Sequence, residues 1–232
     1  MTTFWHFHDR QQEVGRNADS QQILGSCTPE MLLCLICNIP LTLKYELHNI
    51  SPSAICAYGL ILGSLGNIED GIRYGELAVR LLTQLNAKEW EANCAQIFHM
   101  ALRHWKDPYT ECLAALTHAY KTGMTYGDVE FAFYNGMCAV SFFYLAGLYL
   151  EPCESDCRLY CERMRVYNRE NNYSLLSPTW QLLLNLLGRS DNALVLIGEA
   201  MDETVFVENM TKDKNVGALQ TYWISCATIS EI

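Results

Sequence analysis

The fold is decided by residues 51–82, SPSAICAYGLILGSLGNIEDGIRYGELAVRLL. Apolar side chains recur at helical spacing in this stretch, stop at Gly66-Asn67, and then resume with the same period. The pattern predicts two helices joined by a short turn. Small residues recur along the pair, namely Gly59, Gly71, Gly75 and Ala78. We expect them to let the two backbones approach closely, which would offset a cost of up to about 1 kcal/mol for each helical glycine.

Three further helical hairpins are predicted by the same criteria, at residues 89–105 with 110–121, 128–145 with 152–166, and 178–187 with 192–201. The four turns fall at Gly66, Asp107, Gly147 and Gly188, which are 41, 40 and 41 positions apart. A near-constant period with one hairpin per period is typical of an α-solenoid. The predicted fold class is therefore all-α, an α-solenoid of helical hairpins with a period of about 40 residues.

The two ends of the chain depart from this period. Residues 1–28 are predicted to be an irregular lead segment, and residues 29–232 the helical-repeat array, whose last repeat is incomplete. Thr28-Pro29 has the character of a helix start, and the helix after it is expected to reach residue 48 with a kink at Pro40. Residues 215–232 are predicted to be a helix without a partner. Unpaired terminal helices expose apolar faces, so self-association is expected.

Composition excludes several classes of protein. The 232 residues carry a net charge of −10 without a basic stripe, which argues against nucleic-acid binding. The longest apolar run, residues 137–150, is shorter than the roughly 18 to 20 residues that cross a bilayer, so no membrane span is predicted. Eleven cysteines, an odd number, in a large domain without a signal peptide favour reduced buried thiols and a cytoplasmic protein.

Short motifs within residues 30–205 carry a family resemblance. They are Ala57-Tyr58-Gly59-Leu60, Leu65-Gly66-Asn67-Ile68-Glu69-Asp70-Gly71, Tyr74-Gly75-Glu76-Leu77-Ala78, Asn86-Ala87-Lys88-Glu89, Arg103-His104-Trp105-Lys106, Ala119-Tyr120-Lys121-Thr122-Gly123, Gly127-Asp128-Val129-Glu130-Phe131-Ala132 and Asn185-Leu186-Leu187-Gly188. This combination resembles the tetratricopeptide-like repeat region of large hybrid signalling proteins. Those proteins join a Ser/Thr kinase-like domain, a predicted ATPase of the AAA/STAND type, the repeats, a GAF domain and a histidine kinase.

The resemblance implies a non-catalytic scaffold for signal transduction. Its partner would be another protein or the neighbouring domains of a signalling kinase or ATPase, held on a concave surface lined by the stacked first helices. The alternative is a fragment of an ATP-dependent multi-domain signalling enzyme whose catalytic modules lie outside this chain. A phosphate-binding loop upstream and a histidine-kinase region downstream, both in frame, would favour that alternative.

No catalytic or cofactor-binding residue is predicted in the chain itself. A phosphate-binding loop needs a Gly-x-x-x-x-Gly-Lys-Ser/Thr run, and a kinase needs catalytic-loop and Asp-Phe-Gly motifs; the sequence has neither. The acidic groups Glu69-Asp70, Glu151-Glu154-Asp156 and Asp202-Glu203 are interpreted as solvated faces or helix N-terminal charges. We therefore predict that the chain is not an enzyme and binds no cofactor.

Cysteine and histidine side chains are the remaining candidates for a metal site. Cys34 and Cys37 have zinc or redox spacing but lie in an apolar run, so burial in the core is favoured. Cys153, Cys157 and Cys161 share one helix face, to which His118 could add a ligand, although such a stripe is usually core. His6 and His8 have no further metal ligands nearby in the sequence. His104 is interpreted as a positively charged side chain at the C-terminal end of a helix, where it would interact favourably with the helix dipole. The prediction is that no metal is bound.

Overall fold

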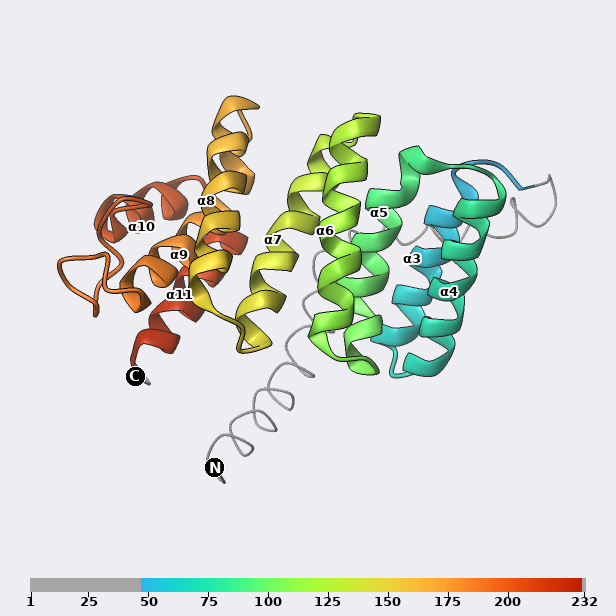
Figure 1. The fold of residues 1–232 in the computed structure, drawn as a ribbon, viewed down its shortest axis with the longest axis horizontal. Coiled ribbons are helices and arrows are strands. Elements are labelled where there is room, and N and C mark those ends of the chain that lie inside the picture. Colours follow the sequence, from blue (N-terminus) through green and yellow to red (C-terminus); the bar gives the residue numbers. More distant parts are fainter. Residues whose placement is uncertain (1–46, 231–232) are drawn as a thin grey trace, which may run out of the picture. The chain divides into compact units, whose positions relative to one another are not determined.

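A computed structural model describes residues 47–230 of the chain, and it is all-α in that range, as predicted. Nine α-helices lie between these residues (Figure 1): α3 Ser51–Ser64, α4 Ile68–Gln84, α5 Glu91–Ala95, α6 Tyr109–Tyr126, α7 Val129–Leu145, α8 Leu150–Val166, α9 Glu170–Leu186, α10 Glu203–Lys212 and α11 Val216–Ser230. The predicted lead segment and first helix lie outside the described residues, as do His6, His8, Cys34 and Cys37. No helix within residues 47–230 has both the length and the apolar character that spanning a bilayer requires.

The described helices divide between two compact units. The first holds α3, α4 and α5 together with residues 121–132, and the second holds residues 109–120 and everything from residue 133 onward. The predicted helix at 89–105 is interrupted in the first unit: α5 continues into a π-helical turn, Gln96–Met100, and then a 3₁₀ turn, Arg103–Trp105. Helix α6 begins directly after Pro108.

The hairpin of α3 and α4 forms as its sequence predicts. Gly66 takes a left-handed backbone conformation with φ of 93°, and the side chain of Asn67 accepts a hydrogen bond from the Asp70 amide at the start of α4. A core of buried side chains packs between α3, α4 and the segment from α5 to residue 102: Cys56, Ile72, Ala78, Leu82, Ala87, Cys94, Phe98 and Leu102. Helix α4 therefore shows its apolar face to this core and its charged face to solvent.

The second unit contains the largest departure from the prediction. The prediction of a helix at residues 192–201 is wrong. Residues 187–202 form an irregular loop, and the next helix, α10, begins at Glu203. The physical reason is a set of buried amide side chains on α9. The Asn185 side chain donates to the carbonyl oxygens of Ala193 and Val195 at 3.2 and 2.7 Å, and Gln181 accepts from the Ala200 amide at 2.9 Å. These backbone groups therefore find partners without forming a helix.

The expectation that α11 lacks a partner is also wrong, because it packs against both α9 and α10. Their shared core contains Leu182, Leu196, Met201, Phe206, Ala218, Tyr222 and Ile229. Helix α9 also packs against α8. The consequence is that α9 lies between two neighbours, while the 187–202 loop contributes Leu196 and Met201 to the same core.

Candidate functional site

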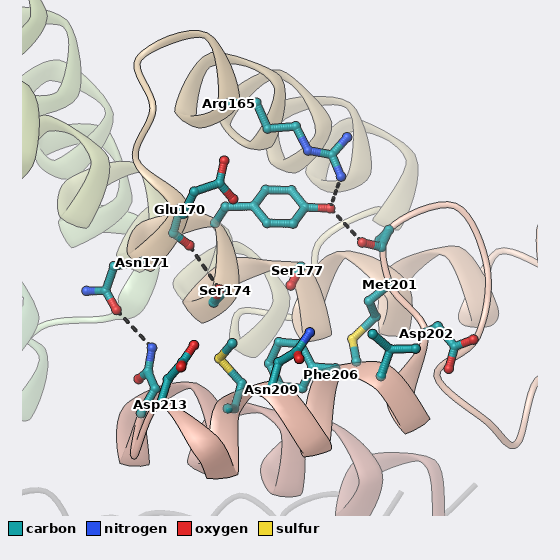
Figure 2. Close-up of a pocket in the computed structure, with 15 residues that line it drawn as sticks. Arg165, Glu170, Asn171, Ser174, Ser177, Met201, Asp202, Phe206, Asn209 and Asp213 are labelled. Atoms are coloured by element: carbon teal, nitrogen blue, oxygen red, sulfur yellow. Dashed lines mark hydrogen bonds between the residues drawn. The ribbon is translucent and has the colours of Figure 1, made fainter.

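A groove of about 830 Å³ lies between α9 and α10, within the second unit (Figure 2). This volume is in the range of ligand-binding pockets. The groove is lined by Arg165, Glu170, Asn171, Tyr173, Ser174, Ser177, Ala200, Met201, Asp202, Val205, Phe206, Asn209, Met210, Asp213 and Asn215. This groove is not apparent from the sequence pattern, because one of its walls is α10, which comes after a loop that the pattern predicts to be a helix.

The wall formed by α9 is polar. Asn171, Ser174 and Ser177 lie at three-residue spacing, so they share one side of the helix. Ser174 donates to the Glu170 carbonyl oxygen at 2.9 Å, and Asn171 accepts a hydrogen bond of 2.9 Å from the Asn215 side chain. Ser177 is different, since it is only 1% exposed and its Oγ has no hydrogen-bond partner within the described part of the chain. This wall thus offers a buried hydroxyl that is able to both donate and accept.

The wall formed by α10 is apolar at its base and polar at its rim. Phe206 is buried and Met210 half-buried, while Asn209 and Asp213 are exposed at the rim. Helix α10 starts at this place because Asp202 is its N-cap residue and accepts a hydrogen bond of 2.9 Å from the Thr204 amide. The Thr204 hydroxyl and amide hold the pKa of Asp202 below its ordinary value. The two walls together present apolar surface beside hydrogen-bonding groups.

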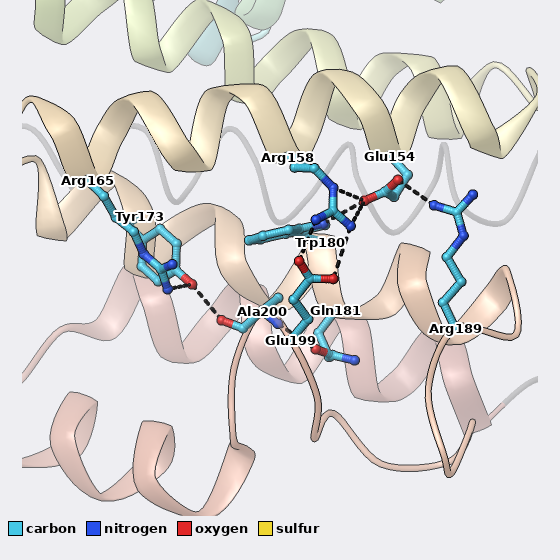
Figure 3. Close-up of polar contacts among 9 residues, drawn as sticks. All are labelled: Glu154, Arg158, Arg165, Tyr173, Trp180, Gln181, Arg189, Glu199 and Ala200. Carbon is cyan, nitrogen blue, oxygen red and sulfur yellow. Dashed lines mark hydrogen bonds and ion pairs between the residues drawn. The ribbon is translucent and has the colours of Figure 1, made fainter.

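A chain of contacts around Tyr173 lies at the edge of the groove (Figure 3). The Arg165 guanidinium lies over the Tyr173 ring, 4.2 Å from its centroid, and donates to the Tyr173 hydroxyl. That hydroxyl in turn donates to the Ala200 carbonyl oxygen at 2.6 Å. Burial raises the pKa of Tyr173, so the phenol keeps its proton at neutral pH. The 187–202 loop is thereby attached to α9 at the edge of the groove.

A second set of contacts attaches the same loop to α8, through the buried carboxylate of Glu154 (Figure 3). Glu154 accepts hydrogen bonds from the Trp180 indole at 3.0 Å, from Arg158 at 3.1 Å and from Arg189 at 2.7 Å. Arg158 also makes a two-point ion pair with Glu199 and lies over the Trp180 ring. The 187–202 loop is therefore held by charged groups on α8.

The interpretation of Glu154 as a solvated acidic residue is wrong, because its side chain is 3% exposed. A signal was present in the sequence: Glu154 lies beside Cys153 and three positions before Cys157, on the side of α8 that the cysteines predict to be buried. An acidic residue on a buried helix face requires a cationic partner. Arg158, one turn later, is that partner.

The cysteine stripe on α8 is part of the core. Cys153, Cys157 and Cys161 are all buried, and burial raises the pKa of Cys153 to about 12 and that of Cys157 well above its ordinary value. Protonated thiols are poor metal ligands. Among the described residues, no group of three or more His, Cys, Asp or Glu side chains is arranged to hold a metal ion.

His104 does not act as a cation at a helix end, contrary to the interpretation from its position. It lies beside Trp105, with ring centroids 4.9 Å apart, and burial lowers its pKa to about 4. The imidazole is therefore neutral at physiological pH. His99, in the π-helical turn, has its pKa lowered to about 4 as well, first by burial and then by the nearby Arg103 guanidinium.

Comparisons of the chain with protein-family models, with curated proteins and with solved structures found no match. The structure therefore defines the class of this protein: it is an all-α protein of packed helix pairs. The groove between α9 and α10 is its candidate functional site.

Proposed function

We propose that this chain is a non-catalytic, tetratricopeptide-like scaffold that binds a segment of another protein in the groove between α9 and α10, and that it serves signal transduction. The observation that carries the proposal is the groove itself, which combines an apolar base with a buried, unpartnered hydroxyl at Ser177. The role in signalling comes from the resemblance of its motifs to the repeat region of hybrid signalling proteins.

The spacing of the helices supports a repeat array. Helices α4, α6 and α8 begin at residues 68, 109 and 150, which are 41 positions apart. Hydrogen bonds also join residues about one period apart: Ser53 donates to Asn93 at 2.6 Å, from α3 to α5. Contacts between the first helices of consecutive hairpins are what stacked repeats produce.

The chemistry of the groove suits a peptide better than a small polar metabolite. Phe206, Met201 and Met210 supply apolar surface for side chains, and methionine adapts its shape to different partners. Asn209, Ser174 and Ser177 supply hydrogen-bonding groups of the kind that recognise a peptide backbone. A protein segment uses both features at once.

Binding to a display library of short random peptides tests the proposal. We expect the purified chain to select peptides, and the rim substitution Asn209→Trp to abolish the selection by filling the groove. Glu208→Trp is the matched control, because Glu208 is the preceding residue of α10, is exposed, and does not line the groove. Failure to select any peptide, or equal selection by both variants, would contradict the proposal.

A further inference from the structure

The groove carries negative charge at one end. Glu170, at the start of α9, and Asp213, the C-cap residue of α10, both line it at the end where Asn171 and Asn215 bond to each other (Figure 2). Both carboxylates are exposed, and neither makes an ion pair within residues 47–230. The C-terminal end of α10 adds partial negative charge at this place.

The lysines nearest in sequence to Asp213 lie outside the groove. Lys212 and Lys214 flank Asp213 in the sequence, but neither of them lines the groove. The cation that does line it, in the described part of the chain, is Arg165, whose guanidinium is stacked on Tyr173. A ligand that brings its own positive charge would therefore meet two carboxylates.

The other part of the groove is suited to an apolar group beside a backbone amide. Figure 2 shows Ser177 across the groove from Phe206. Leaving a buried hydroxyl without a hydrogen bond costs free energy, and a ligand that satisfies it recovers that cost. A peptide amide next to an apolar side chain would fill both positions at once, the amide at Ser177 and the side chain on Phe206.

The two helices fix the distance between these positions. Helices α9 and α10 run antiparallel across the groove, so that Glu170 and Asp213 lie towards the same end and Ser177 is near Phe206 further along. Seven positions separate the two residues on each helix, which corresponds to about 10 Å along the helix axis. A peptide in the polyproline II conformation covers about 9 Å in three residues and returns its side chain to the same face.

We propose that the groove recognises a peptide segment of a partner protein in the polyproline II conformation, with an apolar residue on Phe206 and a Lys or Arg three positions away, at the end of the groove that Glu170 and Asp213 line. This inference rests on the proposed function, since it requires that the groove is the peptide site. It adds the chemistry of the partner: a basic segment that complements the acidic end of the groove.

Fluorescence anisotropy with labelled synthetic peptides tests the inference. The probes share a Gly/Ser frame and contain Leu-x-x-Lys, Leu-x-x-Gln, Leu-x-x-Glu, or Lys moved further from Leu. We expect Leu-x-x-Lys to bind about five- to tenfold more tightly than Leu-x-x-Gln, a preference that decreases as salt is added. The double variant Glu170→Gln with Asp213→Asn should remove the preference, whereas Asp191→Asn with Glu208→Gln, exposed carboxylates outside the groove, should keep it.

Ser177→Ala gives a second readout that a merely structural role would not produce. Removing an unpartnered buried hydroxyl should leave the thermal unfolding midpoint unchanged or raised, yet weaken the binding of every peptide severalfold. Peptides that bind without any preference for Lys, or with a preference that survives the double variant, would overturn this inference and leave the proposed function standing. If no peptide of any charge binds to the folded protein, both are overturned.

Discussion

Gly59 and Gly71 lie backbone against backbone in the first hairpin. A Cβ atom on Gly59 would be 2.6 Å from the carbonyl oxygen of Gly71, and a Cβ atom on Gly71 would be 2.7 Å from the carbonyl oxygen of Gly59. Neither obstacle is a flexible side chain, so any larger residue forces the helices apart. The small residues therefore do what their positions in the sequence predict.

Gly59→Ala and Gly71→Ala should each lower the free energy of unfolding by about 1 to 3 kcal/mol, although alanine is the better helix former. Gly217→Ala is the control, because the Cβ there would meet the end of the Leu175 side chain at 3.1 Å, a contact that a rotation relieves. Urea unfolding followed by circular dichroism measures the difference. Equal stability of all three variants would show that α3 and α4 do not approach this closely.

Glu154→Gln should destabilise the second unit by about 2 to 4 kcal/mol, because the neutral amide places a donor group among the donors of Trp180, Arg158 and Arg189. Glu151→Gln, at an exposed position one turn earlier on α8, should change stability by less than about 0.5 kcal/mol. Thermal unfolding of both variants checks this. A small effect at Glu154 would mean that water, and not the protein, solvates the carboxylate.

Gly198→Ala should release the 187–202 loop, because its Cβ would lie 2.6 Å from Nε2 of Gln181, the residue whose Oε1 holds the Ala200 amide. We expect faster cleavage by trypsin after Arg189 in this variant, measured by mass spectrometry of the digest. Leu194→Ala, in the same loop with an exposed side chain, should be cleaved at the rate of the unmodified protein. Identical rates for all three proteins would count against a loop held by Gln181.

Stability should fall as pH is lowered from about 6.5 to about 4. The pKa values of His99 and His104 are lowered from 6.5 to about 4 in the folded protein, mainly by burial. Between these pH values the unfolded chain takes up protons that the folded chain does not. This uptake lowers the free energy of unfolding by at most about 3 kcal/mol for each histidine. His99→Gln with His104→Gln should flatten this part of the pH profile of urea unfolding. An unchanged slope would mean that neither imidazole is buried as described.

Helices α3, α4, α6, α7 and α8 are predictable because the information is local. Apolar periodicity marks each helix, and Gly66 and Gly147 end helices with the positive φ that glycine allows. Gly188 is also correctly placed as the end of a helix, with φ of 68°. The conformation of the loop after Gly188 was not predictable, since the amide of Asn185 and the carbonyl of Gln181 take backbone partners up to 19 positions away.

The candidate site could not be predicted from the sequence for the same reason. Its walls belong to two helices separated by an irregular loop, so no spacing within one segment reveals that Ser177 and Phe206 face each other. Asp202-Glu203 is interpreted from the sequence as a solvated face or as helix N-terminal charges, and the N-cap hydrogen bond of Asp202 agrees with the second of these. Burial of Glu154 could have been inferred from its neighbours on α8, but its partner Arg189 could not.

The irregular loop also determines which part of the chain folds late. Because residues 187–202 do not return as a helix, the neighbour of α9 on the side away from α8 is α11, which begins thirty positions after α9 ends, whereas α3 and α4 are joined by a three-residue turn. Closing the longer loop costs more chain entropy before any contact compensates for it. Pulse-labelling hydrogen exchange during refolding should find the amides of α3 and α4 protected before those of α11. The groove, which needs α9, α10 and the loop together, would then be completed only in the last stage of folding.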